Sequence, residues 1–228
     1  MNKYIYFLLA TVVFSCGPSD NFTLQGNIKG FKKGTVYLMK IHDTTFVNLD
    51  SVVIEGNSNF TLSCNLEEPE VLFIKMDKKN GVENYVDFFA SQGITTFSST
   101  LKNFIYDAEF TGSEQQKIYK EYKDMLGEYE DKNLELTGQY LMAQVQKDSA
   151  ALDSLQISFD RYLKSKYRYS LNYAANHGNS EVAPYIALSE MPNATVRALE
   201  TVYDSLKVDI KNSKYGKLLQ EEIKKRKE

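Results

Sequence analysis

Apolar and polar residues alternate between residues 22 and 110, and a period of two is typical of half-buried β-strands. The alternation is clearest at residues 22–28, 36–41 and 60–66, and it predicts further strands at 45–54, 71–77, 85–90, 94–99 and 105–110. Turn-forming pairs such as Lys33-Gly34 and Gln92-Gly93 set the strands about 8 to 12 residues apart. Residues 22–111 are therefore expected to form an antiparallel β-sandwich or barrel-like sheet of about eight strands.

A helical period replaces the alternation after residue 112. One apolar face of a long helix is predicted by residues at i, i+4, i+7 and i+11, namely Ile118, Tyr122, Met125 and Tyr129. Ser113 is the expected N-cap of this helix. A second long helix is expected to include 152–173 and to end at Asn176-His177-Gly178, residues that readily adopt the left-handed conformation.

Three shorter helices follow in the same pattern. Asn179-Ser180, Asn193 and Ser213 are expected to cap helices that end near Ser189, Lys207 and Lys225. Residues 112–228 are thus predicted to be a helical domain. The fold class expected for the chain is α+β, with the β-rich half first and the helical half second.

The first fifteen residues have the pattern of a secretory signal peptide. Lys3 supplies a positive charge, and residues 4–14 form an apolar core of about 11 residues, too short to span a bilayer. Val13-Phe14-Ser15-Cys16 resembles a bacterial lipobox, although Phe14 departs from the preferred residue types. We therefore expect residues 1–15 to be removed and Cys16 to be lipidated, with ordinary signal cleavage nearby as the alternative.

Residues 16–21 are short and turn-forming, and they are expected to be a tether between the lipid and the fold. The segment lacks the acidic run that resembles a surface-export signal in such lipoproteins. We expect the protein to be anchored to the outer membrane by its lipid and to face the periplasm. The membrane, contacted through the lipid anchor, is therefore one expected partner.

Composition excludes several classes of function. The net charge is −3 and becomes about −4 once Lys3 is removed, which argues against a nucleic-acid partner. With Cys16 acylated, Cys64 has no second cysteine with which to form a disulfide or a dithiol centre. His42 and His177 cannot build a three-histidine zinc site. No metal, cofactor or catalytic residue is predicted.

The opening Phe22-Thr-Leu-Gln-Gly-Asn-Ile-Lys-Gly and the later Gly34-Thr-Val-Tyr-Leu resemble the domain of unknown function that precedes the thioredoxin domain in Bacteroidota thiol-disulfide lipoproteins. Gly112-Ser113 and the helical segment 179–185 are also similar to that family. The resemblance implies a β-domain followed by a helical insert. Family members continue into a thioredoxin domain with Cys-x-x-Cys, whereas this sequence ends at Glu228 without one. We therefore expect no redox activity of the family's kind.

Three features are candidates for chemistry or binding. The tyrosines of the helical half are expected mostly to pack the helices against the sheet, with their hydroxyls reaching water. A binding surface is the alternative for five of them, because tyrosine offers large contact area at low entropic cost: Tyr122, Tyr129, Tyr162, Tyr169 and Tyr173. Glu121, Asp124 and Glu128 could serve a carboxylate-dependent hydrolase, or form a solvated helix face. Cys64 is expected in the core, with a redox-sensing thiol as the alternative.

A short Asp-Ser/Thr-apolar pattern recurs along the chain and resembles the O-glycosylation sequon of exported Bacteroidota proteins. The candidate acceptor residues are Thr44, Ser51, Ser149, Ser154 and Ser205. Asp-Ser pairs are also common at turns and helix N-caps.

These observations favour a non-catalytic binding or accessory lipoprotein of the cell envelope. The alternative is a truncated partner or regulator of thioredoxin-like thiol-disulfide lipoproteins, which would then be its envelope protein partner. A hydrolase that uses the helix carboxylates is a third hypothesis.

Overall fold

The computed structural model describes residues 20–78 and 84–228. The predicted signal peptide and Cys16 lie outside the described residues. The strands are β1 (Phe22–Lys29), β2 (Lys33–His42), β3 (Thr45–Glu55), β4 (Asn59–Cys64), β5 (Glu70–Asp77), β6 (Asn84–Ala90), β7 (Gly93–Thr100) and β8 (Glu109–Thr111). The helices are α1 (Glu114–Gln146), α2 (Ser149–Asn176), α3 (Val182–Ser189), α4 (Val196–Ser205), α5 (Val208–Lys211) and α6 (Lys214–Lys227).

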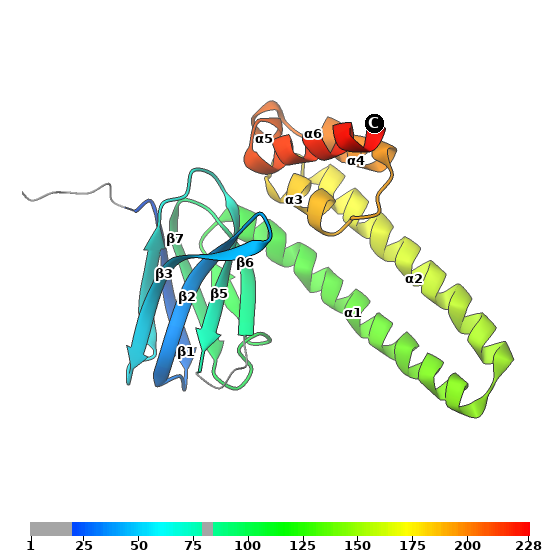
Figure 1. Ribbon diagram of the computed structural model, residues 1–228, viewed down its shortest axis with the longest axis horizontal. Coiled ribbons are helices and arrows are strands. Elements are labelled where there is room, and N and C mark those ends of the chain that lie inside the picture. Colours follow the sequence, from blue (N-terminus) through cyan, green and yellow to red (C-terminus); the bar gives the residue numbers. More distant parts are fainter. Residues whose placement is uncertain (1–19, 79–83) are drawn as a thin grey trace, which may run out of the picture.

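Two four-stranded sheets form a sandwich at the N-terminal side of the molecule (Figure 1). Their strand orders are β4-β1-β7-β8 and β3-β2-β5-β6. The predicted α+β class and its strand-rich first half are confirmed. One pairing differs from the antiparallel expectation, because β1 runs parallel to β7, with Phe22 beside Gly93.

The alternating pattern places one side chain in two inside the sandwich. Phe22, Leu24 and Ile28 of β1 are fully buried, while Gln25 between them faces solvent. On β6, Phe88 stacks on Phe110 of β8 with ring centroids 4.6 Å apart. Cys64 is buried in the same core, as the alternation predicted.

The predicted strand at 105–110 is mostly a turn. Phe104 is the residue that enters the core there, and Ile105 is exposed. The turn is held by side chains, because Ser99 Oγ donates to the Phe104 carbonyl at 2.7 Å and Thr100 Oγ1 donates to Asp107 at 2.6 Å. The Ser99 bond gives the Phe104 carbonyl a partner without a neighbouring strand, so the turn is stabilised locally.

Helices α1 and α2 form a long antiparallel hairpin that projects away from the sandwich (Figure 1). The short helices α3–α6 gather where the hairpin meets the β-half. A hydrophobic core there joins β5 and β6 to all the larger helices. Phe89 lies at its centre, with ring centroids 5.9 Å from both Tyr119 and Tyr215 and 5.8 Å from Tyr185.

Two predicted caps are confirmed, since Ser113 and Ser213 accept hydrogen bonds from the backbone of α1 and α6. The N-cap of α3 is Glu181, without a side-chain cap hydrogen bond, rather than the predicted Asn179-Ser180. The cap of α4 was predicted wrongly: Thr195, not Asn193, accepts the first-turn bond, from Ala198. The end of α2 also differs, because His177 has φ −112° and is not left-handed. Gly178 is needed for close approach instead, since a Cβ there would overlap the backbone carbonyl of Ser205.

Two glycine substitutions should have opposite effects on stability. We expect Gly178→Ala to lower the free energy of unfolding by about 1–3 kcal/mol, because the added carbon meets backbone. Gly127→Ala, in the middle of α1 with nothing within 4 Å of the added carbon, should raise it by about 0.5–1 kcal/mol. Urea denaturation of the two variants measures both values. Equal changes in the free energy of unfolding would contradict the close approach assigned to Gly178 and the open space assigned to Gly127.

Candidate functional site

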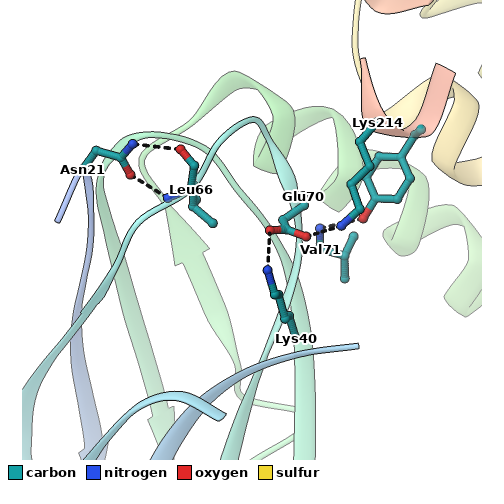
Figure 2. A network of polar contacts seen from close by, with 7 residues as sticks. Asn21, Lys40, Leu66, Glu70, Val71 and Lys214 are labelled. Carbon is teal, nitrogen blue, oxygen red and sulfur yellow. Dashed lines mark hydrogen bonds and ion pairs between the residues drawn. The ribbon is translucent and has the colours of Figure 1, made fainter. Parts of the chain in front are cut away.

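A buried carboxylate lies where the sandwich meets the last helix. Glu70, the first residue of β5, is 7% exposed. Its carboxylate forms ion pairs with Lys40 of β2, at 3.8 Å, and with Lys214 of α6. Figure 2 shows the two lysines approaching Glu70 from the sheet and from the helix. Each half of the protein thus contributes one cation to the same acid.

The N-terminus of α6 is bound to β5 by further polar contacts. Glu68 accepts a hydrogen bond from the backbone amide of Lys214 at 2.6 Å. The Tyr215 hydroxyl accepts one from the amide of Val71 at 3.0 Å. Carboxylates are favoured at a helix N-terminus because the helix dipole is positive there. The sheet and α6 are therefore fixed to each other by both charge and hydrogen bonding.

This junction opens into a cleft of about 820 Å³. Its wall carries cations, carboxylates and apolar side chains, including Lys217, Glu67, Phe73 and Leu218. The Glu70 and Glu68 carboxylates on this wall are already paired with Lys40 and Lys214, as described above. Within the part of the chain that the structure describes, no three His, Cys, Asp or Glu residues are grouped as a metal site. The cleft is best described as a polar opening beside the contacts that fix the sheet to α6.

Asn21, at the end of the predicted tether, is fixed to the sandwich. Its side chain donates to the Leu66 carbonyl at 2.8 Å and accepts from the Leu66 amide at 2.8 Å, as Figure 2 shows. Ser63 also donates to the Asp20 carboxylate. The chain is thus held from Asp20 onward, directly before β1.

Cys64 lies close to this region but is an unreactive thiol. Burial, together with the nearby carboxylates of Asp20 and Glu70, raises its pKa from 9.0 to about 11. The thiolate is the reactive form of cysteine, and at neutral pH almost none of it is present. These properties favour the core role over the redox-sensing role.

The five tyrosines considered as a possible binding surface lie together between α1 and α2. Their rings form a continuous series, in which Tyr122 stacks on Tyr169 at 5.6 Å, Tyr169 contacts Tyr129 at 5.8 Å and Tyr129 contacts Tyr162 at 6.2 Å. Tyr173 contacts both Tyr122 and Tyr169. We call this series the tyrosine ladder.

The tyrosine ladder belongs mainly to the helix packing. Tyr122 is fully buried and shares a 2.8 Å hydrogen bond with Ser170, so it offers no surface to a ligand. Tyr173 donates to the Ile118 carbonyl at 2.7 Å. Burial raises the pKa of Tyr169 to about 12, so the hydroxyl stays protonated at neutral pH. Tyr129 and Tyr162 are half-buried and line a groove of about 550 Å³ with Arg161.

The remaining predicted residues are exposed. Asp124 forms an ion pair with Lys120 at 2.9 Å, as residues four apart on a helix do. Glu121 and Glu128 also lie on the exposed side of α1. The candidate glycosylation residues all face solvent, at the β2–β3 turn, on β3, on α2 and at the end of α4: Thr44, Ser51, Ser149, Ser154 and Ser205.

The sequence analysis missed a feature at the far end of the hairpin. Residues 136–146 contain no charged side chain, although half of residues 114–135 are charged. Large apolar side chains are exposed there, with exposed fractions of 73% for Leu134, 56% for Leu141, 68% for Met142 and 84% for Val145. A helical stretch without charged residues indicates an apolar surface, and this stretch could be recognised from the sequence.

Glu70 should be important for stability. Glu70→Gln removes the charge that the two lysines share, and we expect the free energy of unfolding to fall by about 1–3 kcal/mol. Glu67→Gln is a matched control, because Glu67 is exposed and only three residues away, and it should change stability by less than about 0.5 kcal/mol. Chemical denaturation compares the two. Equal losses of unfolding free energy in the two variants would argue that the Glu70 ion pairs do not fix the sheet to α6.

Comparison with known proteins identifies the family of the N-terminal half. Residues 22–119 match the model of a family described as "Domain of unknown function (DUF4369)". The match covers the sandwich and the first turns of α1, where Gln116 accepts a hydrogen bond from the Phe89 amide at 2.7 Å. No curated protein matches the chain. Residues 22–119 are thus a DUF4369 domain, from which the helical hairpin projects.

Proposed function

We propose that this protein is a lipid-anchored, periplasm-facing docking module of the cell envelope, which binds another protein through the far end of its helical hairpin and catalyses no reaction. The observation that carries the proposal is the apolar far end of that hairpin, where residues 136–146 carry no charge and Leu134, Leu141, Met142 and Val145 are exposed. Large apolar surfaces that face water on a folded protein mark interaction sites.

The hairpin gains little stability from its own far end. The buried cluster there consists of Leu136, Ala143 and Leu155, with a few half-buried neighbours. Helices in proteins are stabilised mostly by tertiary packing of an apolar face, and in the described part of the chain the face of α1 that carries Leu134, Leu141 and Val145 is exposed. A bound partner would supply that packing.

The arrangement suits a module that reaches away from its anchor. Helix α1 has 33 residues, which makes it about 50 Å long. Among the described residues no helix is long and apolar enough to cross a membrane. The proposed anchor depends on Cys16, and the proposed recognition depends on the far end of the hairpin.

The proposed partner is an envelope protein. A thioredoxin-like thiol-disulfide lipoprotein is the alternative within this proposal, because the DUF4369 domain at residues 22–119 resembles the domain that precedes thioredoxin domains in those proteins. In that case the chain would act as a partner or regulator, with no thiol chemistry of its own.

The anchor can be tested with Cys16→Ala. Acylation and cleavage at this position should be lost, which leaves an uncleaved precursor or a product cut elsewhere. Acyl labelling should disappear, and any product cut elsewhere should leave the membrane fraction. Protease treatment of intact cells should leave the wild-type protein intact, because we expect it to face the periplasm. An unlabelled wild-type protein would refute the lipid anchor, while digestion in intact cells would refute the inward orientation alone.

The docking surface can be tested by site-specific photocrosslinking in cells. A photoreactive residue at Leu141 or Val145 should give a discrete protein adduct, whose composition mass spectrometry identifies. Tyr106, which is 92% exposed on the sandwich, is the matched control and should give none. A thioredoxin-like protein in the adduct would support the alternative partner. Equal labelling from all three positions would contradict the proposal.

A further inference from the structure

The cleft beside Glu70 is large enough to hold a small molecule. Its volume of about 820 Å³ lies within the roughly 300–1,000 Å³ that is usual for ligand pockets. Its wall comes from several separate parts of the chain, namely the end of β2 with its turn, residues 65–73, and helices α3 and α6. Ligand sites occur preferentially where parts of a protein meet in this way. The groups on the wall decide which class of ligand fits.

Apolar surface lines both the interior and the rim of the cleft. In the interior, the rings of Tyr185 and Tyr215 have centroids 5.1 Å apart, and Phe73 is half-buried on β5. The Tyr215 hydroxyl already accepts a hydrogen bond from a β5 amide, so this residue offers a ligand mainly its ring. At the rim, Ile41 is 46% and Leu218 42% exposed. The cleft therefore has apolar surface for more than one hydrophobic side chain of a ligand.

Two lysines in the cleft have hydrogen-bond donors that the fold does not use. Lys40 Nζ lies 3.8 Å from the Glu70 carboxylate, which is an ion pair but too long for a hydrogen bond. Within residues 20–78 and 84–228, the Lys40 ammonium donates no hydrogen bond, and the exposed Lys217 has no partner for its ammonium at all. Each ammonium carries three donors. Both lysines are thus able to bind the carboxylate of a ligand.

Glu67 supplies the opposite charge. Three other acids that line the cleft already have a partner in the fold: Glu68, Glu70 and Asp43. The Glu67 carboxylate is exposed and, in the part of the chain that the structure describes, forms no ion pair or hydrogen bond. Glu67 precedes β5, whereas Lys217 belongs to α6. The cleft therefore presents an anionic and a cationic group from different elements to one ligand.

We infer that the cleft binds a short peptide that has two free ends and apolar side chains. Lys40 and Lys217 bind its terminal carboxylate, Glu67 binds its terminal ammonium, and the aromatic interior and the apolar rim bind its side chains. Neutral sugars lack both charges, and fatty acids lack the ammonium, so neither class matches all of these groups. This site is separate from the far end of the hairpin, and the inference does not depend on the proposed docking function.

Calorimetric titration of the full-length protein in detergent tests the ligand class, with the dipeptide leucyl-leucine as the probe. We expect leucyl-leucine to bind at least about tenfold more tightly than its N-acetyl or C-amide form, because each blocked form loses one charge-assisted contact. Free leucine should also bind at least about tenfold more weakly, since it has one apolar side chain fewer. The absence of leucyl-leucine binding would overturn the inference, as would equal affinity for a blocked form or for leucine.

Substitutions in the wall test which group binds each end of the peptide. Lys217→Gln should weaken leucyl-leucine about tenfold and leave the affinity for the C-amide form unchanged, because that form has no carboxylate. Glu67→Gln should likewise weaken leucyl-leucine but not its N-acetyl form. Lys225→Gln is the matched control, since Lys225 is exposed on α6 and does not line the cleft. Circular dichroism checks that the variants are folded.

An equal loss of affinity in Lys217→Gln and Lys225→Gln would overturn the assigned site, as would unchanged affinity in both Lys217→Gln and Glu67→Gln. Failure of this inference is distinguishable from failure of the proposed docking function. Peptide binding is read from calorimetry of the purified protein, whereas docking is read from adducts at Leu141 and Val145 in cells.

Discussion

Phe88 and Phe89 are neighbours on β6, so their side chains leave opposite faces of the sheet. Phe88 enters the sandwich core and stacks on Phe110, while Phe89 enters the core between the sheet and the helices. The arrangement of the molecule depends on this pair, because one short strand belongs to both cores. The register of β6 on β5 therefore also places Phe89 against the first turns of α1, where Gln116 accepts a hydrogen bond from its amide.

Polar contacts around β6 fix the orientation of the helices relative to the sheet. Apolar packing alone would not fix that orientation. Gln116 binds the Phe89 amide, and Tyr119 donates to Asp87 on the same strand. At the other side of the joint, Glu70 is shared by Lys40 and Lys214. A buried acid that loses its cations is strongly disfavoured, so the sheet and α6 keep one relative position.

Local patterns predicted the elements of this fold well, since strand alternation and serine N-caps depend on neighbouring residues alone. Long-range features were beyond such patterns. The parallel pairing of β1 with β7 follows from how the sheets close, and the burial of Tyr122 follows from the position of α2. Tyrosine's amphipathic character allowed either a surface or a packing role, and the second helix decided between them. The uncharged end of the hairpin could have been found, because it is visible in residues 136–146 alone.

The attachment of Asn21 to Leu66 has a mechanical consequence. Under the proposed lipidation, any force between membrane and protein enters the fold just before β1. This strand lies inside its sheet, between β4 and β7, rather than at an edge. A pull along β1 would load the hydrogen bonds on both of its sides in shear, so that many must break together, whereas an edge strand could be peeled off one bond at a time. Under the proposed lipidation, β1 would therefore be the strand that bears tension from the membrane.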